Sequence, residues 1–265
     1  MIRSLLNETP DWGLFLLFVG GGTVIIVAVF LLVRRSLSAW RTDASSGVVG
    51  AVAAMVMTLF ALVLAFVVVN LYQGYQDATN NVVAEANSLA EVVHDAQVFP
   101  KAEQVRIDVA VANYVREVLN EEFPALRDGR QDPSAFTKLN DIFTTMQQYS
   151  PRTQAQITFF DSAVEQVKDV VSEHRNRVLD ADTSLPAAFV ALLALTALLS
   201  LATTFFFKAD HPGLEVMLIA IISIVIISGL LTVILLEYPF SGTVAVSSDP
   251  FNQGVLAQLL AAYPR

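Results

Sequence analysis

Cysteine is absent from this 265-residue sequence, and charged residues make up only 15% of it. Without cysteine the chain has neither a disulfide framework nor a thiolate metal site, although its cellular compartment stays open. A soluble domain carries about 25% charged residues, so this deficit excludes an ordinary soluble protein. The 16 Lys and Arg are outnumbered by 25 Asp and Glu, which argues against nucleic acid as a partner.

Catalytic and metal-binding motifs are also missing. The sequence has no GxSxG, HExxH, P-loop or dinucleotide-binding pattern, and its three histidines are far apart in the chain. We therefore expect neither an enzyme nor a bound metal or cofactor. The one enzymatic hypothesis left open is a membrane enzyme that acts on lipid, in which His94 and the acids of residues 72–184 converge in space.

Long apolar runs are what the sequence has in abundance. Four of them lack charged residues in their interior: 12–33, 48–71, 185–207 and 214–236. Each is long enough to cross about 30 Å of hydrocarbon as a helix, which satisfies its own backbone polar groups in lipid. We therefore predict four transmembrane helices. The first is retained, because Arg34 and Arg35 follow it in place of the small-residue cleavage site of a signal peptide.

The loop between the first two runs predicts the orientation. It contains Arg34, Arg35 and Arg41 against a single acid, Asp43. Short basic loops stay in the cytoplasm. Both termini and the long central segment are then expected on the outer side, which is the periplasmic side of a bacterial inner membrane.

Residues 72–184 form the one long polar segment. They contain 10 Lys and Arg against 18 Asp and Glu, a net charge of −8. Their apolar spacing is helical, and prolines divide them into four helices of an antiparallel bundle. We expect its first and last helices to continue into the second and third spans. The expected fold is an all-α membrane protein with transmembrane helices in 12–71 and 185–236, an extramembrane bundle in 72–184, and a turn with a short amphipathic helix in 237–265.

The second span carries small residues at steps of three and four, which brings them to one face of the helix. They are Gly47, Ala51, Ala54, Thr58, Ala61 and Ala65. Membrane helices associate by close backbone approach, which small residues permit. The stripe predicts a packing seam. Packing within the protomer is the simpler interpretation, and packing between the protomers of a homo-oligomer is the alternative.

Hydroxyl side chains share one face of the third span, at Thr196, Ser200 and Thr203. At this spacing they either line a wet ion pathway or bond to their own helix. Glu237 ends the fourth span and is a candidate pore-mouth carboxylate, or else a lone acid at the interface. No ionisable group lies deep in a span, which argues against active transport.

Two further features concern structure rather than chemistry. Glu85 borders the apolar seam of the first bundle helix, while Arg175 and Arg177 border that of the last, so an ion pair would join these helices if they are neighbours. After the fourth span, proline and glycine predict a turn at the membrane edge. The turn consists of Pro239, Phe240, Ser241 and Gly242.

Several short motifs occur in a particular order along the chain. The most distinctive are Leu185-Pro186 and Pro239-Phe240-Ser241-Gly242, and others are Glu85-Ala86, Glu121-Glu122-Phe123-Pro124 and Pro151-Arg152-Thr153. Together they resemble a bacterial integral-membrane family labelled bestrophin-like. The resemblance implies two spans, a helical insert and two more spans. It implies no established chemistry.

Two functional hypotheses fit these patterns. The first is a homo-oligomeric, passive channel for inorganic ions that is gated through the helical segment. The second is a non-conducting sensor or scaffold in the lipid bilayer that binds a partner through residues 72–184.

Overall fold

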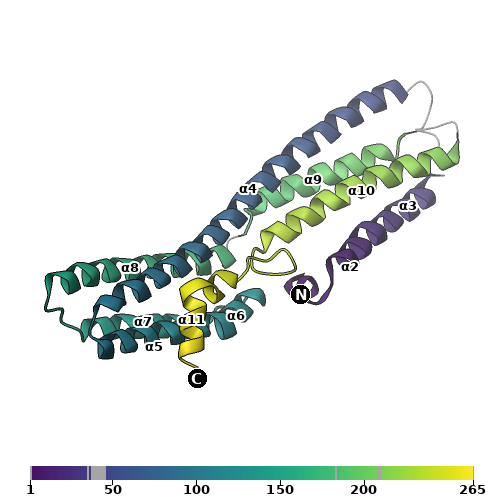
Figure 1. Cartoon of the computed structure of the whole chain (residues 1–265). Coiled ribbons are helices and arrows are strands. Elements are labelled where there is room, and N and C mark those ends of the chain that lie inside the picture. Colours follow the sequence, from purple (N-terminus) through teal and green to yellow (C-terminus); the bar gives the residue numbers. More distant parts are fainter. Residues whose placement is uncertain (1, 35, 37–45, 183, 208–210, 265) are drawn as a thin grey trace. The chain divides into compact units, whose positions relative to one another are not determined.

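The computed structural model describes residues 2–34, 36, 46–182, 184–207 and 211–264. Within these ranges every regular element is a helix and no strand occurs, which confirms the all-α prediction. The chain divides into two compact units (Figure 1). The head unit comprises Met1–Asn7, Gly74–Thr183 and Tyr238–Arg265, and the membrane unit comprises Glu8–Gln73 and Ser184–Glu237.

Four stretches of the described chain are long and apolar enough to cross a membrane, as predicted. The first joins α2 (Asp11–Phe15), a π-helical turn (Leu16–Gly20) and α3 (Gly21–Val33). The second is the first half of α4 (Ser46–Asp95), and the others are α9 (Ala187–Thr204) and α10 (Pro212–Glu237). The protein is therefore a multi-pass membrane protein. Arg35 and Arg41, which predict the orientation, lie outside the described residues.

The core of the membrane unit joins three of these helices. Its buried side chains come in pairs from α4, α9 and α10: Phe60 and Val67, Leu193 and Ala197, Ile226 and Val233. A Cβ atom on Gly229 would lie only 2.5 Å from Leu64 Cδ2. Glycine in α10 thus allows α4 to approach closely, which is how membrane helices gain packing energy.

Helix α3 packs against α10 in antiparallel fashion. Ile227 fills the space over Gly22, where a Cβ atom would lie 2.8 Å from its Cδ1. Near the other end of the same pair, Arg34 and Glu215 form a salt bridge with 3.3 Å between Nη2 and Oε2. The ion pair lies at one end of the α3–α10 contact, on the side where short loops connect the spans.

The head unit is a helical bundle built on the second half of α4 (Figure 1). The other long helices are α5 (Lys101–Glu117), α7 (Ser134–Gln147) and α8 (Gln154–Asp182). A π-helical turn (Val118–Glu122) and the short α6 (Phe123–Arg127) link α5 to α7. Prolines separate these helices because proline has no N–H for an interior helical hydrogen bond.

The first and last helices of the predicted bundle differ in how they connect to the neighbouring spans. Helix α4 is uninterrupted over 50 residues, so the expected continuity of the second span with the first bundle helix is confirmed. The expected continuity of the last bundle helix with the third span is wrong. Helix α8 ends at Asp182, and Pro186 precedes α9 with an extended backbone (ψ 135°). A residue that precedes proline disfavours the helical conformation, which explains the break.

Residues 238–265 are part of the head unit rather than a separate tail. Helix α11 (Gly254–Ala262) packs on α5, and both Phe251 and Leu256 are buried. The hydroxyl of Tyr263 donates a hydrogen bond of 3.3 Å to Asp108 Oδ2. The head therefore extends beyond residues 72–184 and draws on three separate segments of the chain.

Candidate functional site

The buried charges of the head unit meet around Arg177. Its guanidinium is fully buried together with the carboxylates of Glu85 and Glu122. Arg177 Nε donates to Glu85 Oε2 at 2.8 Å, and Nη2 donates to Glu85 Oε1 at 3.0 Å and to Glu122 Oε2 at 3.2 Å. Two acids thus share one cation. The three side chains together carry one negative charge when both acids are ionised.

Two further polar side chains complete this cluster, which we call the Arg177 cluster. The hydroxyl of Tyr114 donates to Glu85 Oε1 at 2.5 Å. The Nδ1 atom of His174 lies 3.2 Å from Arg177 Nη2 and 3.6 Å from Glu122 Oε1. The same Nδ1 atom also lies 3.2 Å from the hydroxyl oxygen of Tyr114.

Burial sets the protonation states of the cluster. Burial, aided by the charge of Arg177, lowers the pKa of His174 to about 4, which keeps the ring neutral at pH 7. Burial raises the pKa of Glu122 to about 7; Arg177 acts against this shift and the charge of Glu85 adds to it. Glu122 Oε1 is buried with no hydrogen-bond partner. The cluster can therefore bind or release one proton near neutral pH.

The local fold explains how these residues come together. Glu122 ends the π-helical turn after α5, and the extra residue in such a turn changes the direction of the following side chains. The rings of Phe123 and Phe251 lie 5.2 and 5.7 Å from the Arg177 guanidinium, within the range of a cation–π contact. Phe251 belongs to the segment after the last span, so that segment covers the cluster.

The structure brings together two of the three residues that sequence suggested as an ion pair. Glu85 and Arg177 are in contact, whereas Arg175 is exposed. Glu122 was not assigned a role from sequence. The available signal was its place in the motif Glu121-Glu122-Phe123-Pro124, but a π-helical turn has no 3.6-residue periodicity to show that Glu122 points inward.

The hydroxyl face of α9 points into the membrane unit. Thr196 and Ser200 are buried, and Thr203 is half-buried. The hydroxyl of Thr196 donates to Leu192 O at 2.9 Å, and that of Thr203 donates to Ser200 O at 2.8 Å. Residues that line an axis between protomers are exposed in the single protomer. Thr196 and Ser200 therefore do not line such an axis.

The small-residue stripe of α4 has the opposite placement. All six members are exposed in the protomer: Gly47, Ala51, Ala54, Thr58, Ala61 and Ala65. The α4 face that packs inside the unit carries Ala53, Phe60 and Val67. The simpler interpretation, packing within the protomer, is therefore wrong. Larger side chains on a neighbouring face bury more apolar area and take that role.

The family model of the bestrophin-like domain matches residues 20–251. The chain belongs to the bestrophin-like family. The resemblance inferred from short motifs is thereby confirmed, since the match covers all four spans apart from the first residues of the first one. Comparison with curated proteins and with solved structures found no match.

In this bestrophin-like protein the turn after α10 belongs to the head unit. Ser241 is buried and its hydroxyl donates to Arg127 O at 2.8 Å. Gly242 has a φ of 81°, and its N–H donates to Asn7 Oδ1 at 2.8 Å. Phe240 is buried in the core, and Pro239 O accepts a hydrogen bond from the N–H of Val246. The turn ties the first helix, α1 (Ile2–Glu8), to the end of α6.

The remaining predicted residues lie apart from these features. Glu237 is half-buried as the last residue of α10. His94 is exposed at the end of α4. Within the described chain, no three His, Cys, Asp or Glu side chains are grouped as metal ligands.

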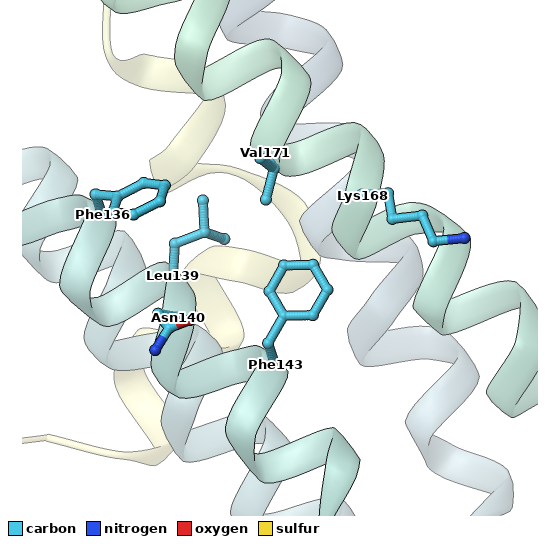
Figure 2. Close-up of a pocket in the computed structure, with 6 residues that line it drawn as sticks. All are labelled: Phe136, Leu139, Asn140, Phe143, Lys168 and Val171. Atoms are coloured by element: carbon cyan, nitrogen blue, oxygen red, sulfur yellow. The ribbon is translucent and has the colours of Figure 1, made fainter.

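The head of this bestrophin-like protein also has an open apolar groove of about 210 Å³ between α7 and α8 (Figure 2). Phe136, Leu139, Phe143 and Val171 converge on it, while Lys168 lies at the edge. The ring of Phe136 lies 6.2 Å from that of His174, between centroids. One wall of the groove thus contacts the Arg177 cluster.

Proposed function

We propose that this protein is a passive ion channel that assembles as a homo-oligomer and is gated through its head unit. The observation that carries the proposal is the inward face of α9, where hydroxyls enter the interior of an otherwise apolar membrane unit. A threonine that donates its hydrogen to its own helix still presents oxygen lone pairs to that interior. Such oxygens replace part of an ion's hydration shell.

Passive conduction fits better than active transport. Carriers that couple to protons need acids or histidines inside the membrane. In the described parts of the four spans, the one buried ionisable side chain is Glu215, in the first turn of α10 and paired with Arg34. Its position at the end of a span suits a structural ion pair.

The exposed stripe on α4 supports assembly from several copies. Small residues at steps of three and four, turned away from their own protomer, match the surface that membrane helices use to associate. The same helix runs without interruption to Glu85. A change in the Arg177 cluster therefore acts on a helix that also carries the stripe, and this is the proposed route of gating.

We also propose a bacterial inner membrane as the location, with the head and both termini on the outer side. The motive is the excess of arginine in the loop between the first two spans. In this orientation the protonation of Glu122 responds to the pH outside the cytoplasm.

The test is ion flux through the purified protein in liposomes. Flux of K⁺, Na⁺ or Cl⁻ is expected, and Ser200→Ala or Thr203→Val should change its rate at least severalfold. Leu199→Val, on the exposed side of the same helix, is the matched control and should leave the rate unchanged. Liposomes that stay silent with all three ions would remove the channel hypothesis.

The groove between α7 and α8 favours a second candidate, a sensor or scaffold that binds a partner. Apolar side chains exposed in a groove are a common docking feature. A photo-crosslinking residue in place of Phe143 should then capture a partner in cells, and Phe136→Glu should abolish the capture. The same crosslinker at exposed Ser172 is the control. Capture of the protein itself alone would count against this candidate.

A further inference from the structure

Three hydroxyls in the membrane unit are buried and have no hydrogen-bond partner. They belong to Thr23 on α3, Ser200 on α9 and Ser223 on α10. The two serines are 0% exposed and Thr23 is 9% exposed. Other hydroxyls of this unit donate to a carbonyl of their own helix: Thr58, Thr196, Thr203, Thr204 and Thr232. The three unpartnered hydroxyls thus depart from the pattern of their surroundings.

Contacts between the helices place the three hydroxyls at one depth. The salt bridge of Arg34 with Glu215 and the contact of Gly22 with Ile227 fix one antiparallel register for α3 and α10. In this register Thr23 lies at the same depth in the membrane as Ile226. Ser223 precedes Ile226 by three residues, so its depth differs by about 4.5 Å along the helix axis.

Helix α9 adds the third hydroxyl at the same depth. The rings of Phe30 and Phe205 lie 5.6 Å apart, which sets α9 alongside α3. Ser200 precedes Phe205 by five residues and is therefore level with position 25 of α3. All three hydroxyls lie close to the middle of the first span, Trp12–Val33.

We propose that these three hydroxyls hold water at mid-membrane inside each protomer and that this site admits a small monovalent cation. A buried hydroxyl without a partner costs about 1–3 kcal/mol, and water is the usual remedy where protein groups do not supply the bond. The proposal rests on the proposed channel function. It assigns the pathway to the interior of the protomer rather than to an axis between protomers.

Two features favour a cation. Thr196 and Thr204, buried on α9 beside Ser200, have committed their hydrogens to carbonyls and present only oxygen lone pairs to a further ligand. Residues 72–184 carry a net charge of −8, from 10 basic and 18 acidic residues, which concentrates cations near the membrane surface.

The absence of cysteine makes the site directly testable. Thr23→Cys, Ser200→Cys and Ser223→Cys would each be reconstituted as the full chain in liposomes and exposed to Ag⁺ in chloride-free nitrate buffer. Thiols that remain free are then counted with a fluorescent maleimide after unfolding in detergent. Leu199→Cys and Ile224→Cys are lipid-facing neighbours of the two serines, and exposed Ser172→Cys is the reactive control.

At mid-membrane, Ag⁺ should block the Ser200→Cys and Ser223→Cys thiols at least tenfold faster than those of their lipid-facing neighbours. Equal rates would overturn the site. Flux of K⁺ and Cl⁻, measured on a second set of liposomes without Ag⁺, separates the two proposals. Fast Ag⁺ reaction without K⁺ flux retains the water site and removes the channel. K⁺ flux with unreactive thiols removes the water site and retains the channel. Flux of Cl⁻ in preference to K⁺ overturns the cation assignment.

Discussion

Arg177 and Glu85, 92 residues apart in the chain, are joined by two parallel hydrogen bonds inside the head unit. This two-pronged contact is the geometry in which a guanidinium binds a carboxylate most strongly. It links α8 to α4, and it also fixes the position of Glu122, which shares the same Nη2 atom. The stability and the proton binding of the head therefore depend on one side chain.

Replacing Arg177 should destabilise the head unit severely. Arg177→Met leaves the carboxylates of Glu85 and Glu122 buried without their cation, and breaking a buried pair in this way costs about 3–5 kcal/mol. Pulse proteolysis of the full chain in detergent, across a urea series, measures the loss. Arg175→Met is the matched control and should stay within about 0.5 kcal/mol, because that side chain is exposed. Equal midpoints for the two variants would contradict the structural role of Arg177.

The stability of the head should depend on pH through Glu122. Its pKa is about 7 in the folded protein against an ordinary 4.5, so folding takes up a proton between these values. The free energy of unfolding of the wild type, relative to that of Glu122→Gln, is therefore highest below pH 4.5. This advantage is lost as the pH rises through 7. The change amounts to roughly 3 kcal/mol. The charged and titratable groups that act on Glu122 are Glu85, Asp132, His174 and Arg177.

His174 acts in the opposite direction and provides the control. Its pKa is lowered to about 4, so it costs stability as the pH falls from 6.5 to 4. The pH profile of His174→Gln should therefore lack this acid loss while keeping the Glu122 dependence. Unfolding midpoints at pH 4.5, 6 and 8 distinguish the two residues. A wild-type profile parallel to that of Glu122→Gln would refute the proton uptake.

Bulky substitutions on the α4 stripe should dissociate the oligomer. Ala54→Leu and Ala61→Leu separate surfaces that require close backbone approach. A shift from oligomer to monomer by light scattering in detergent is expected, with the helix content unchanged. Ala194→Leu introduces the same side chain at an exposed position of α9 and should leave the mass unaltered. An unchanged mass in all variants would show that the stripe is not an interface.

Gly242 should resist substitution because of its backbone. Its φ of 81° costs an L-residue about 1–2 kcal/mol, although a Cβ atom there meets Leu6 only at an ordinary 3.5 Å. Gly242→Ala should lower the unfolding midpoint of the head accordingly. Gly74→Ala, within helix α4 and with no atom within 4 Å of its Cβ position, should raise stability slightly. Similar effects for both would contradict the turn's role.

Much of the fold follows from local patterns in the sequence. The four spans are apolar over their whole length, and proline marks the helix ends near Phe99 and Gln148, so neither required tertiary information. The contact of Glu85 with Arg177 was accessible because both residues border apolar seams. Each of these features follows from the pattern within a single helix, where helical periodicity applies; that the helices of Glu85 and Arg177 are neighbours is a tertiary contact.

The parts that sequence did not provide depend on contacts between distant segments. The inward direction of Glu122 results from a π-helical turn, and the place of Phe251 over Arg177 results from packing of a distant segment. The exposure of the α4 stripe reflects competition between two helix faces, which spacing alone does not decide. The depth shared by Thr23, Ser200 and Ser223 requires the register between helices.

The origin of the head in three segments has a consequence for biosynthesis. Residues 74–183 emerge from the ribosome before the last two spans, yet Phe251 and Leu256, which complete the core, follow them. Until the fourth span is inserted, Arg177 lacks one of its covering rings and α5 lacks α11. The head can thus reach its final packing only after Phe251 and Leu256 have left the ribosome, so its folding is completed late in synthesis.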